Sequence, residues 1–160
     1  MIDDLNGLVT STVIDIFKSL LSMKVTPAGP APAVRNGEPH VAASVGFVGR
    51  LTGILYIHTS ASFARRITAT LLRLQDNEID GDEMVNDAIG EMANMVVGRI
   101  KSCLSDRGLP CTLTVPSVVR GKDFSVESIS SVRGQILAFE TDQTPFFIEV
   151  QIKSSDQKPA

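Results

Sequence analysis

The chain has 160 residues, of which 43% are apolar and 21% charged, and its formal net charge at pH 7 is −3. This length fits a single domain over residues 1–160, with enough core to fold without disulfides or metals. The slightly acidic balance and the lack of a basic stripe argue against nucleic acid as a partner. No apolar run approaches the ~20 residues of a membrane helix. The acidic start MIDDLNG differs from a basic secretory signal, so we expect a cytoplasmic protein without membrane contact.

Cysteine and histidine are too few for a metal centre. The two cysteines, Cys103 and Cys111, and the two histidines, His40 and His58, show no ligand spacing. We expect reduced structural thiols, and surface or structural roles for both histidines rather than catalytic ones. The sequence has no phosphate loop, dinucleotide-binding glycine motif or nucleophile elbow, so no metal or cofactor is predicted for this chain.

The N-terminal part predicts a helix followed by a hairpin. Residues 2–23 place apolar side chains at helical spacing, and the prolines that follow make residues 27–39 an extended connector. Two β-branched, apolar runs at residues 41–49 and 51–59 predict a pair of antiparallel strands with a tight turn between them. In the second strand alternate residues are apolar on both faces, which indicates helices on one side and partial cover on the other.

A second helix is expected over residues 61–75, with Ser60 or Ser62 as its N-cap. A polar break follows at residues 76–81.

A third helix is predicted over Asp82–Asp106, where no proline interrupts the chain. Asp80 and Glu83 resemble a capping box at its start, and Gly108 suits its end. Seven residues form an apolar stripe that would face a core: Val85, Ala88, Ile89, Met92, Val96, Ile100 and Cys103.

Strand-forming residues dominate the rest of the chain. Three or four strands are expected, over residues 112–120, 124–129, 134–141 and 146–153, with a turn at 142–145 and a frayed tail at 154–160. Because like elements follow one another instead of alternating, we expect an α+β fold with helices packed on a mainly antiparallel sheet.

The outer face of the third helix carries the most informative residues. At about 100° per residue, Asp87, Glu91 and Asn94 fall within an arc of roughly 60° opposite the apolar stripe, and Gly98 joins them one turn later. Asp, Asn and Gly are weak helix formers, costing up to ~1 kcal/mol each relative to Ala. Close approach of a partner would explain them, although an ordinary solvated acidic face has the same pattern.

Glu91 and Asn94 would project side by side from this helix. The carboxylate suits pairing with a lysine or arginine, and the carboxamide can hold a water molecule while it donates and accepts hydrogen bonds. Without a histidine, cysteine or metal ligand, the pair makes a poor active site alone. It suits one half of a composite site whose other half already holds a metal and a labile phosphoryl group.

At these residues the chain resembles the CheC/CheX/FliY family of chemotaxis response-regulator phosphatases, and most closely its CheX-like branch. The family pattern is an Asp or Ser, a Glu four residues later, an Asn three residues after that, and a proline farther downstream. Asp87, Glu91, Asn94 and Pro116 match this pattern. The resemblance covers about residues 41–153 and implies a CheC/CheX-like fold.

The resemblance also implies a mechanism. In the family, the glutamate pairs with a lysine of the phosphorylated receiver domain, and the asparagine enters the receiver's active site to orient the hydrolytic water. Carried over to this chain, Glu91 would dock the receiver and Asn94 would act in catalysis, with Asp87 and Gly98 beside them at the partner surface. The divalent ion, usually Mg²⁺, belongs to the receiver, so this chain would need no cofactor.

CheX-like proteins carry one such site per chain, and the first predicted helix here has no matching Glu and Asn in register. That branch is dimeric through exchange of sheet elements, so we expect a homodimer. The expected function is dephosphorylation of an aspartyl-phosphate on a CheY-like receiver. The alternative is a non-catalytic dimeric module that binds a receiver, or acts as a scaffold, in a chemotaxis or two-component pathway.

Overall fold

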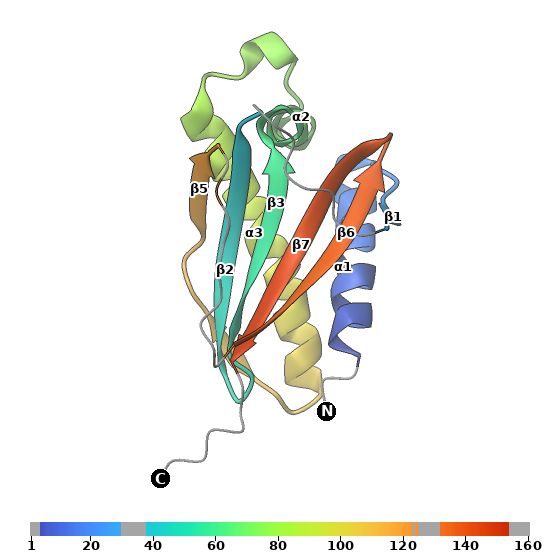
Figure 1. Ribbon diagram of the computed structural model, residues 1–160, viewed down its shortest axis with the longest axis vertical. Helices are drawn as coiled ribbons and strands as arrows, with labels where there is room; N and C mark the ends of the chain where they lie inside the picture. The colour runs from blue at the N-terminus through green and yellow to red at the C-terminus, as the bar shows by residue number, and fades with distance from the viewer. Residues whose placement is uncertain (1–3, 30–37, 123, 125–131, 154–160) are drawn as a thin grey trace.

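The computed structural model describes residues 4–29, 38–122, 124 and 132–153. Helices α1 (Leu5–Leu21), α2 (Ala61–Leu72) and α3 (Asp82–Asp106) pack on a seven-stranded antiparallel sheet. Figure 1 shows α1 and α3 behind the sheet. The strands are β1 (Thr26–Pro27), β2 (His40–Gly49), β3 (Gly53–Ser60), β4 (Cys111–Leu113), β5 (Ser117–Gly121), β6 (Val132–Thr141) and β7 (Thr144–Lys153). The predicted α+β class is therefore confirmed. No helix in these ranges is long and apolar enough to cross a membrane.

The central strands of the sheet run in the order β6-β7-β3-β2, with β1 at one edge. At the other edge β4 and β5 both pair with β2, one after the other along its length. The single strand predicted over residues 112–120 is therefore split. Its middle residues include Pro116, which has no backbone N–H to donate to the ladder.

The helices cover one face of the sheet and form the core with it. Strand residues alternate in direction, so Val41, Val45 and Leu55 point toward the helices and are buried. Phe146 of β7 lies at the centre of an aromatic cluster, with ring centroids 4.9 Å from Phe17, 5.4 Å from Phe63 and 5.5 Å from Phe139. Aromatic contacts of this kind add about 0.5–1.5 kcal/mol each beyond area burial, so β7 is firmly held to α1 and α2.

Helix α3 has the bounds that the sequence predicts, and its apolar stripe faces the core. All seven predicted stripe residues are buried except Cys103, which is half-buried. The cysteines Cys103 and Cys111 are both free thiols.

Helix ends differ more from the prediction. Helix α2 stops at Leu72 and not at residue 75, because Arg73 adopts a left-handed conformation with φ of 56°. Ser60 caps the start of this helix, where its hydroxyl accepts from the Phe63 N–H at 3.1 Å. Helix α1 likewise ends at Leu21, before the predicted residue 23, because Ser22 adopts a left-handed conformation with φ of 52°.

The capping box predicted from Asp80 and Glu83 is wrong. Gly81 stands between Asp80 and the first helical residue, so Gly81 and not Asp80 is the N-cap of α3. Its φ is 85°, and it makes no side-chain cap. A capping contact occurs earlier, at the 3₁₀ helix η1 (Asp76–Glu78). There the Glu78 carboxylate accepts from the Gln75 N–H at 2.8 Å.

The connector and the last turn also differ in detail. β1 overlaps the predicted connector at Pro27 and pairs with β6, a contact that its two residues do not predict. The β6–β7 turn is tighter than predicted, with Asp142 and Gln143 at φ of 48° and 63°, and Pro145 lies within β7. The strand predicted over residues 124–129 and the tail at 154–160 lie outside the described residues, apart from Phe124, which is not in a strand.

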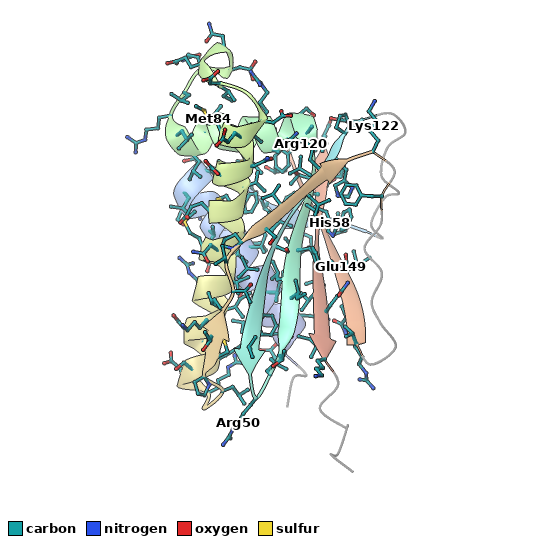
Figure 2. The ribbon with its side chains drawn as sticks, turned by 90° about the vertical axis from the view of Figure 1, so that its left-hand side faces the viewer. Arg50, His58, Met84, Arg120, Lys122 and Glu149 are labelled. Atoms are coloured by element: carbon teal, nitrogen blue, oxygen red, sulfur yellow. The ribbon has the colours of Figure 1, made fainter. Side chains whose placement is uncertain are left out.

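Both histidines are buried on the sheet face away from the helices, so the surface interpretation is wrong. His40 Nε2 lies 2.9 Å from His58 Nδ1, and His58 Nε2 lies 2.9 Å from Glu149 Oε1. Gln151 donates to the other oxygen of Glu149 at 3.0 Å. This chain of hydrogen bonds joins β2, β3 and β7, which is a structural role; Figure 2 labels two of its members.

Candidate functional site

Helix α3 places the predicted site residues on its outward face. The Asp87 and Glu91 side chains are exposed, whereas Asn94 and Gly98 are half-buried. This follows from the neighbouring stripe, since burial of Ile89, Met92 and Val96 turns the opposite side of the helix outward. Within the described residues, the side chains of Asp87, Glu91 and Asn94 have no hydrogen bond or ion pair, so they are available to another molecule.

Gly98 leaves open space beside Asn94. A methyl group built at Gly98 would meet no heavy atom within 4 Å, so neighbouring packing does not require glycine there. Its φ is also not positive, so the backbone conformation does not require glycine either.

The segment between β4 and β5 forms a wall beside the site. A methyl group built at Gly90 would lie 3.6 Å from Pro116 Cβ and 3.8 Å from Val118 Cγ2. Pro116 therefore packs directly against α3 at Gly90, the residue that precedes Glu91 in the sequence. A small residue at position 90 allows this approach of the two segments.

An arginine attaches β5, which follows this segment, to the start of α3. Arg120 of β5 donates from Nη2 to Asn86 Oδ1 at 2.9 Å, and its Nε lies 3.7 Å from Asp82 Oδ2. Figure 2 shows Arg120 on the strand that crosses in front of the sheet near the start of α3. Sequence reasoning missed this contact, because it depends on how two segments more than thirty residues apart meet.

A groove of about 440 Å³ lies on the other side of the site, between the end of α2 and the first half of α3. Asp87 and Glu91 belong both to this groove and to the predicted site. Leu71 and Leu72 of α2 line its opposite side, which the sequence analysis did not identify.

The chemistry of these residues is limited to docking and positioning. Among the described residues, no group of three His, Cys, Asp or Glu side chains is placed to hold a metal ion. The α3 face offers carboxylates and a carboxamide, without a nucleophile or a histidine base. Such a set can hold a partner and orient a water molecule, but a labile group must come from the partner.

Comparison with known proteins identifies the family. The model of the family "Chemotaxis phosphatase CheX" matches residues 41–140. The chain belongs to this family. A CheY-P phosphatase CheX from Thermotoga maritima is a homologue, 26% identical over 129 residues that cover 79% of this chain and 81% of the relative.

Solved structures have the same fold. A CheC-like superfamily protein from Shewanella sp. PV-4 is 26% identical, with a TM-score of 0.79 over 96% of this chain and 100% of the other. CheX from Borrelia burgdorferi, solved as a CheX–CheY–BeF3–Mg²⁺ complex, is 20% identical, with a TM-score of 0.72 over 96% of this chain and 98% of the other. This chain is thus a homologue of CheX phosphatases that act on the response regulator CheY.

Proposed function

We propose that this member of the CheX family hydrolyses the aspartyl-phosphate of a CheY-like receiver domain, with Glu91 and Asn94 as its working residues. The supporting observation is the outward placement of both side chains on α3, without a partner in the described part of the chain. Their spacing of three residues directs them to the same target.

In this proposal Glu91 docks the receiver. Its exposed carboxylate pairs with a lysine ammonium group of the receiver near the phosphorylated aspartate. Asp87 lies one turn earlier on the same face and adds negative charge to the docking surface. The open space at Gly98 lets the receiver come close to the helix at the level of Asn94.

Asn94 then enters the receiver's active site and positions the attacking water. The carboxamide accepts a hydrogen bond from the water and aligns its oxygen with the phosphorus atom. A bond forms between the water oxygen and phosphorus, the bond to the aspartate oxygen breaks, and inorganic phosphate leaves. Mg²⁺, held by the receiver, neutralises the developing charge. The Borrelia burgdorferi complex, which contains CheY, BeF3 and Mg²⁺ together with CheX, supports this division of roles.

The test compares Glu91→Ala and Asn94→Ala on a phosphorylated CheY receiver in the presence of Mg²⁺. We expect Glu91→Ala mainly to raise KM, since it removes a docking contact, and Asn94→Ala mainly to lower kcat, since its contact is made in the transition state. Full activity of Asn94→Ala would refute the assignment. Receiver binding by the unaltered protein without faster phosphate loss would instead indicate the non-catalytic module.

We also propose a homodimer formed through the sheet. Among the described residues, the sheet face away from the helices exposes four large apolar side chains: Val48, Ile54, Val119 and Ile136. Such side chains favour a partner on that face. Exchange of sheet elements stays a prediction. Sedimentation equilibrium that gives only the 17.2 kDa monomer would contradict the dimer.

A further inference from the structure

The groove between α2 and α3 has an apolar side and an acidic side. Leu71 and Leu72 of α2 face Met84 and Ala88 of α3 across it. Figure 2 shows Met84 at the end of α3 that lies beside α2. Leu72 remains 45% exposed, although it is a large apolar residue. The groove thus offers an apolar surface that the described part of the chain leaves partly uncovered.

Carboxylates follow the α3 side of this groove. Asp80 precedes α3, and Glu83, Asp87 and Glu91 follow at intervals of four residues, which places these three in one row along the helix. Like charges four residues apart destabilise a helix by a few tenths of a kcal/mol per pair, roughly 0.2–0.5. In the described ranges none of the four has an ion-pair partner.

Helix stability explains only the first half of this row. Asp80 and Glu83 lie at the N-terminus of α3, where negative charge is favourable. Asp87 and Glu91 lie beyond the first turn, where the helix dipole gives no such benefit. Their repulsion is therefore uncompensated by any ion pair among the described residues, and a cationic partner would remove it.

We propose that this groove is a second docking surface for the receiver, which places an apolar side chain against Leu72 and flanking lysine or arginine side chains against the carboxylate row. The inference rests on the proposed function, because it extends the surface that begins at Glu91. Two observations favour the receiver as the occupant. The row carries only negative charge, which suits the lysine that the proposed mechanism places on the receiver, and the groove is continuous with the proposed site through Asp87 and Glu91.

A second copy of this chain fits less well. With a formal net charge of −3, it would bring further negative charge to the acidic row. It would also cover Glu91, which the receiver must reach. Receiver docking in the groove would instead hold the receiver along the first half of α3 while Asn94 acts at the next turn.

The test is the substitution Leu72→Gln, with Leu20→Gln as its matched control. Both leucines lie in the last turn of a helix that ends in a left-handed residue, and their exposures are similar, 45% and 43%. Leu20 belongs to α1 and does not line the groove. Binding is measured by titration with a CheY receiver in BeF3⁻ and Mg²⁺, and hydrolysis with the phosphorylated receiver.

We expect Leu72→Gln to raise Kd and KM by about five- to tenfold, as expected for loss of one partly buried leucine contact, with little change in kcat. Leu20→Gln should bind like the unaltered protein. Asp87→Asn should weaken binding and reduce its dependence on salt, since a screened charge contact is removed.

Equal Kd values for Leu72→Gln and Leu20→Gln would overturn the groove while leaving the phosphatase proposal intact. Conversely, if the unaltered protein binds the receiver without accelerating hydrolysis and Leu72→Gln weakens that binding, the groove stands and the phosphatase proposal fails. If Leu72→Gln alone dissociates a homodimer of this chain, the occupant is a second copy and the inference is wrong. Circular dichroism of both variants establishes that they are folded.

Discussion

Gly98 occupies a position in the middle of α3 where the chain's own packing does not require glycine. Helix propensity disfavours it by up to ~1 kcal/mol relative to alanine, and the space around its Cα is open within the described structure. The proposed receiver surface lies at this turn of the helix. The proposed partner, and not the fold, would therefore require glycine at residue 98.

The substitution Gly98→Ala should therefore stabilise the protein and impair its activity. We expect the free energy of unfolding in urea to rise by about 0.5–1 kcal/mol, because alanine favours the helix. The rate of receiver dephosphorylation should fall, because the added methyl group blocks close approach at Asn94. Ser19→Ala on α1 is the control, since it also raises helix propensity but lies on another helix. Unchanged activity of Gly98→Ala would show that the receiver does not approach there.

The contact between Gly90 and Pro116 joins α3 to the segment that links β4 and β5. The distance of 3.6 Å from a methyl group at Gly90 to Pro116 Cβ is an ordinary van der Waals contact, so one added carbon fits. Larger side chains must push this segment away from α3. The spacing of these two elements thus limits the size of residue 90.

We expect Gly90→Ala to keep or slightly raise stability, and Gly90→Leu to lower it by about 1–3 kcal/mol through overpacking. Urea unfolding measures both changes. Amide hydrogen exchange in Ser117–Gly121 should increase in Gly90→Leu alone, because β5 is displaced with Pro116. If Gly90→Leu is as stable as Gly90→Ala, the close contact between these elements is absent in solution.

The histidine chain across β2, β3 and β7 makes the sheet sensitive to acid. Burial, followed by the neighbouring His58, lowers the pKa of His40 from 6.5 to about 4. With both rings neutral, His40 Nε2–H donates to His58 and His58 Nε2–H donates to Glu149. His40 Nδ1 then has no partner in the described structure, so a proton there would be a buried, unsatisfied donor.

Acid should therefore destabilise the fold. Between pH 6.5 and about 4 the unfolded chain binds a proton at His40 that the folded chain does not, so stability falls as the pH falls. The slope reaches about 1.4 kcal/mol per pH unit. The pKa of Glu149 is also lowered: burial raises it, but hydrogen bonds from His58 and Gln151 outweigh that effect. Below pH 4.5 the unfolded chain binds a proton at Glu149 before the folded chain does, so this group also lowers the stability of the fold as the pH falls.

Urea unfolding of His40→Gln at several pH values tests this contribution. Glutamine can still donate to His58 but does not titrate, so the variant should lose less stability than the unaltered protein between pH 6.5 and 4. Parallel pH profiles for the two proteins would contradict the assignment to His40.

The molecule as a whole shows which features local sequence determines. The bounds and inward stripe of α3 follow from a long periodic pattern without proline, and the same periodicity fixes the outward direction of Asp87 and Glu91. The order of the three helices and of the longer strands is likewise readable, because each of these runs is long enough to show its period. The resemblance of the α3 residues to the CheX family adds the function that periodicity alone leaves open.

Other features depend on contacts between distant segments. The pairing of β1 with β6 is one such feature, and the split between β4 and β5 is another, since each is set by the partner strand. The groove beside Glu91 requires the end of α2 to lie next to α3, which no local pattern in either helix indicates. Likewise, the end of α2 at Arg73 rests on a left-handed conformation that arginine seldom adopts.

The proposed role of Asn94 is best tested by the rate of phosphate release from a saturating amount of phosphorylated CheY receiver with Mg²⁺, measured for the unaltered protein and for Asn94→Ala. Saturation removes differences in docking, so the comparison reports the hydrolytic step alone. We expect Asn94→Ala to lose about 10²-fold of the acceleration, the scale on which removal of one transition-state contact acts, while its Kd for the BeF3⁻ receiver stays nearly unchanged. Equal rates for the two proteins would show that Asn94 does not position the attacking water.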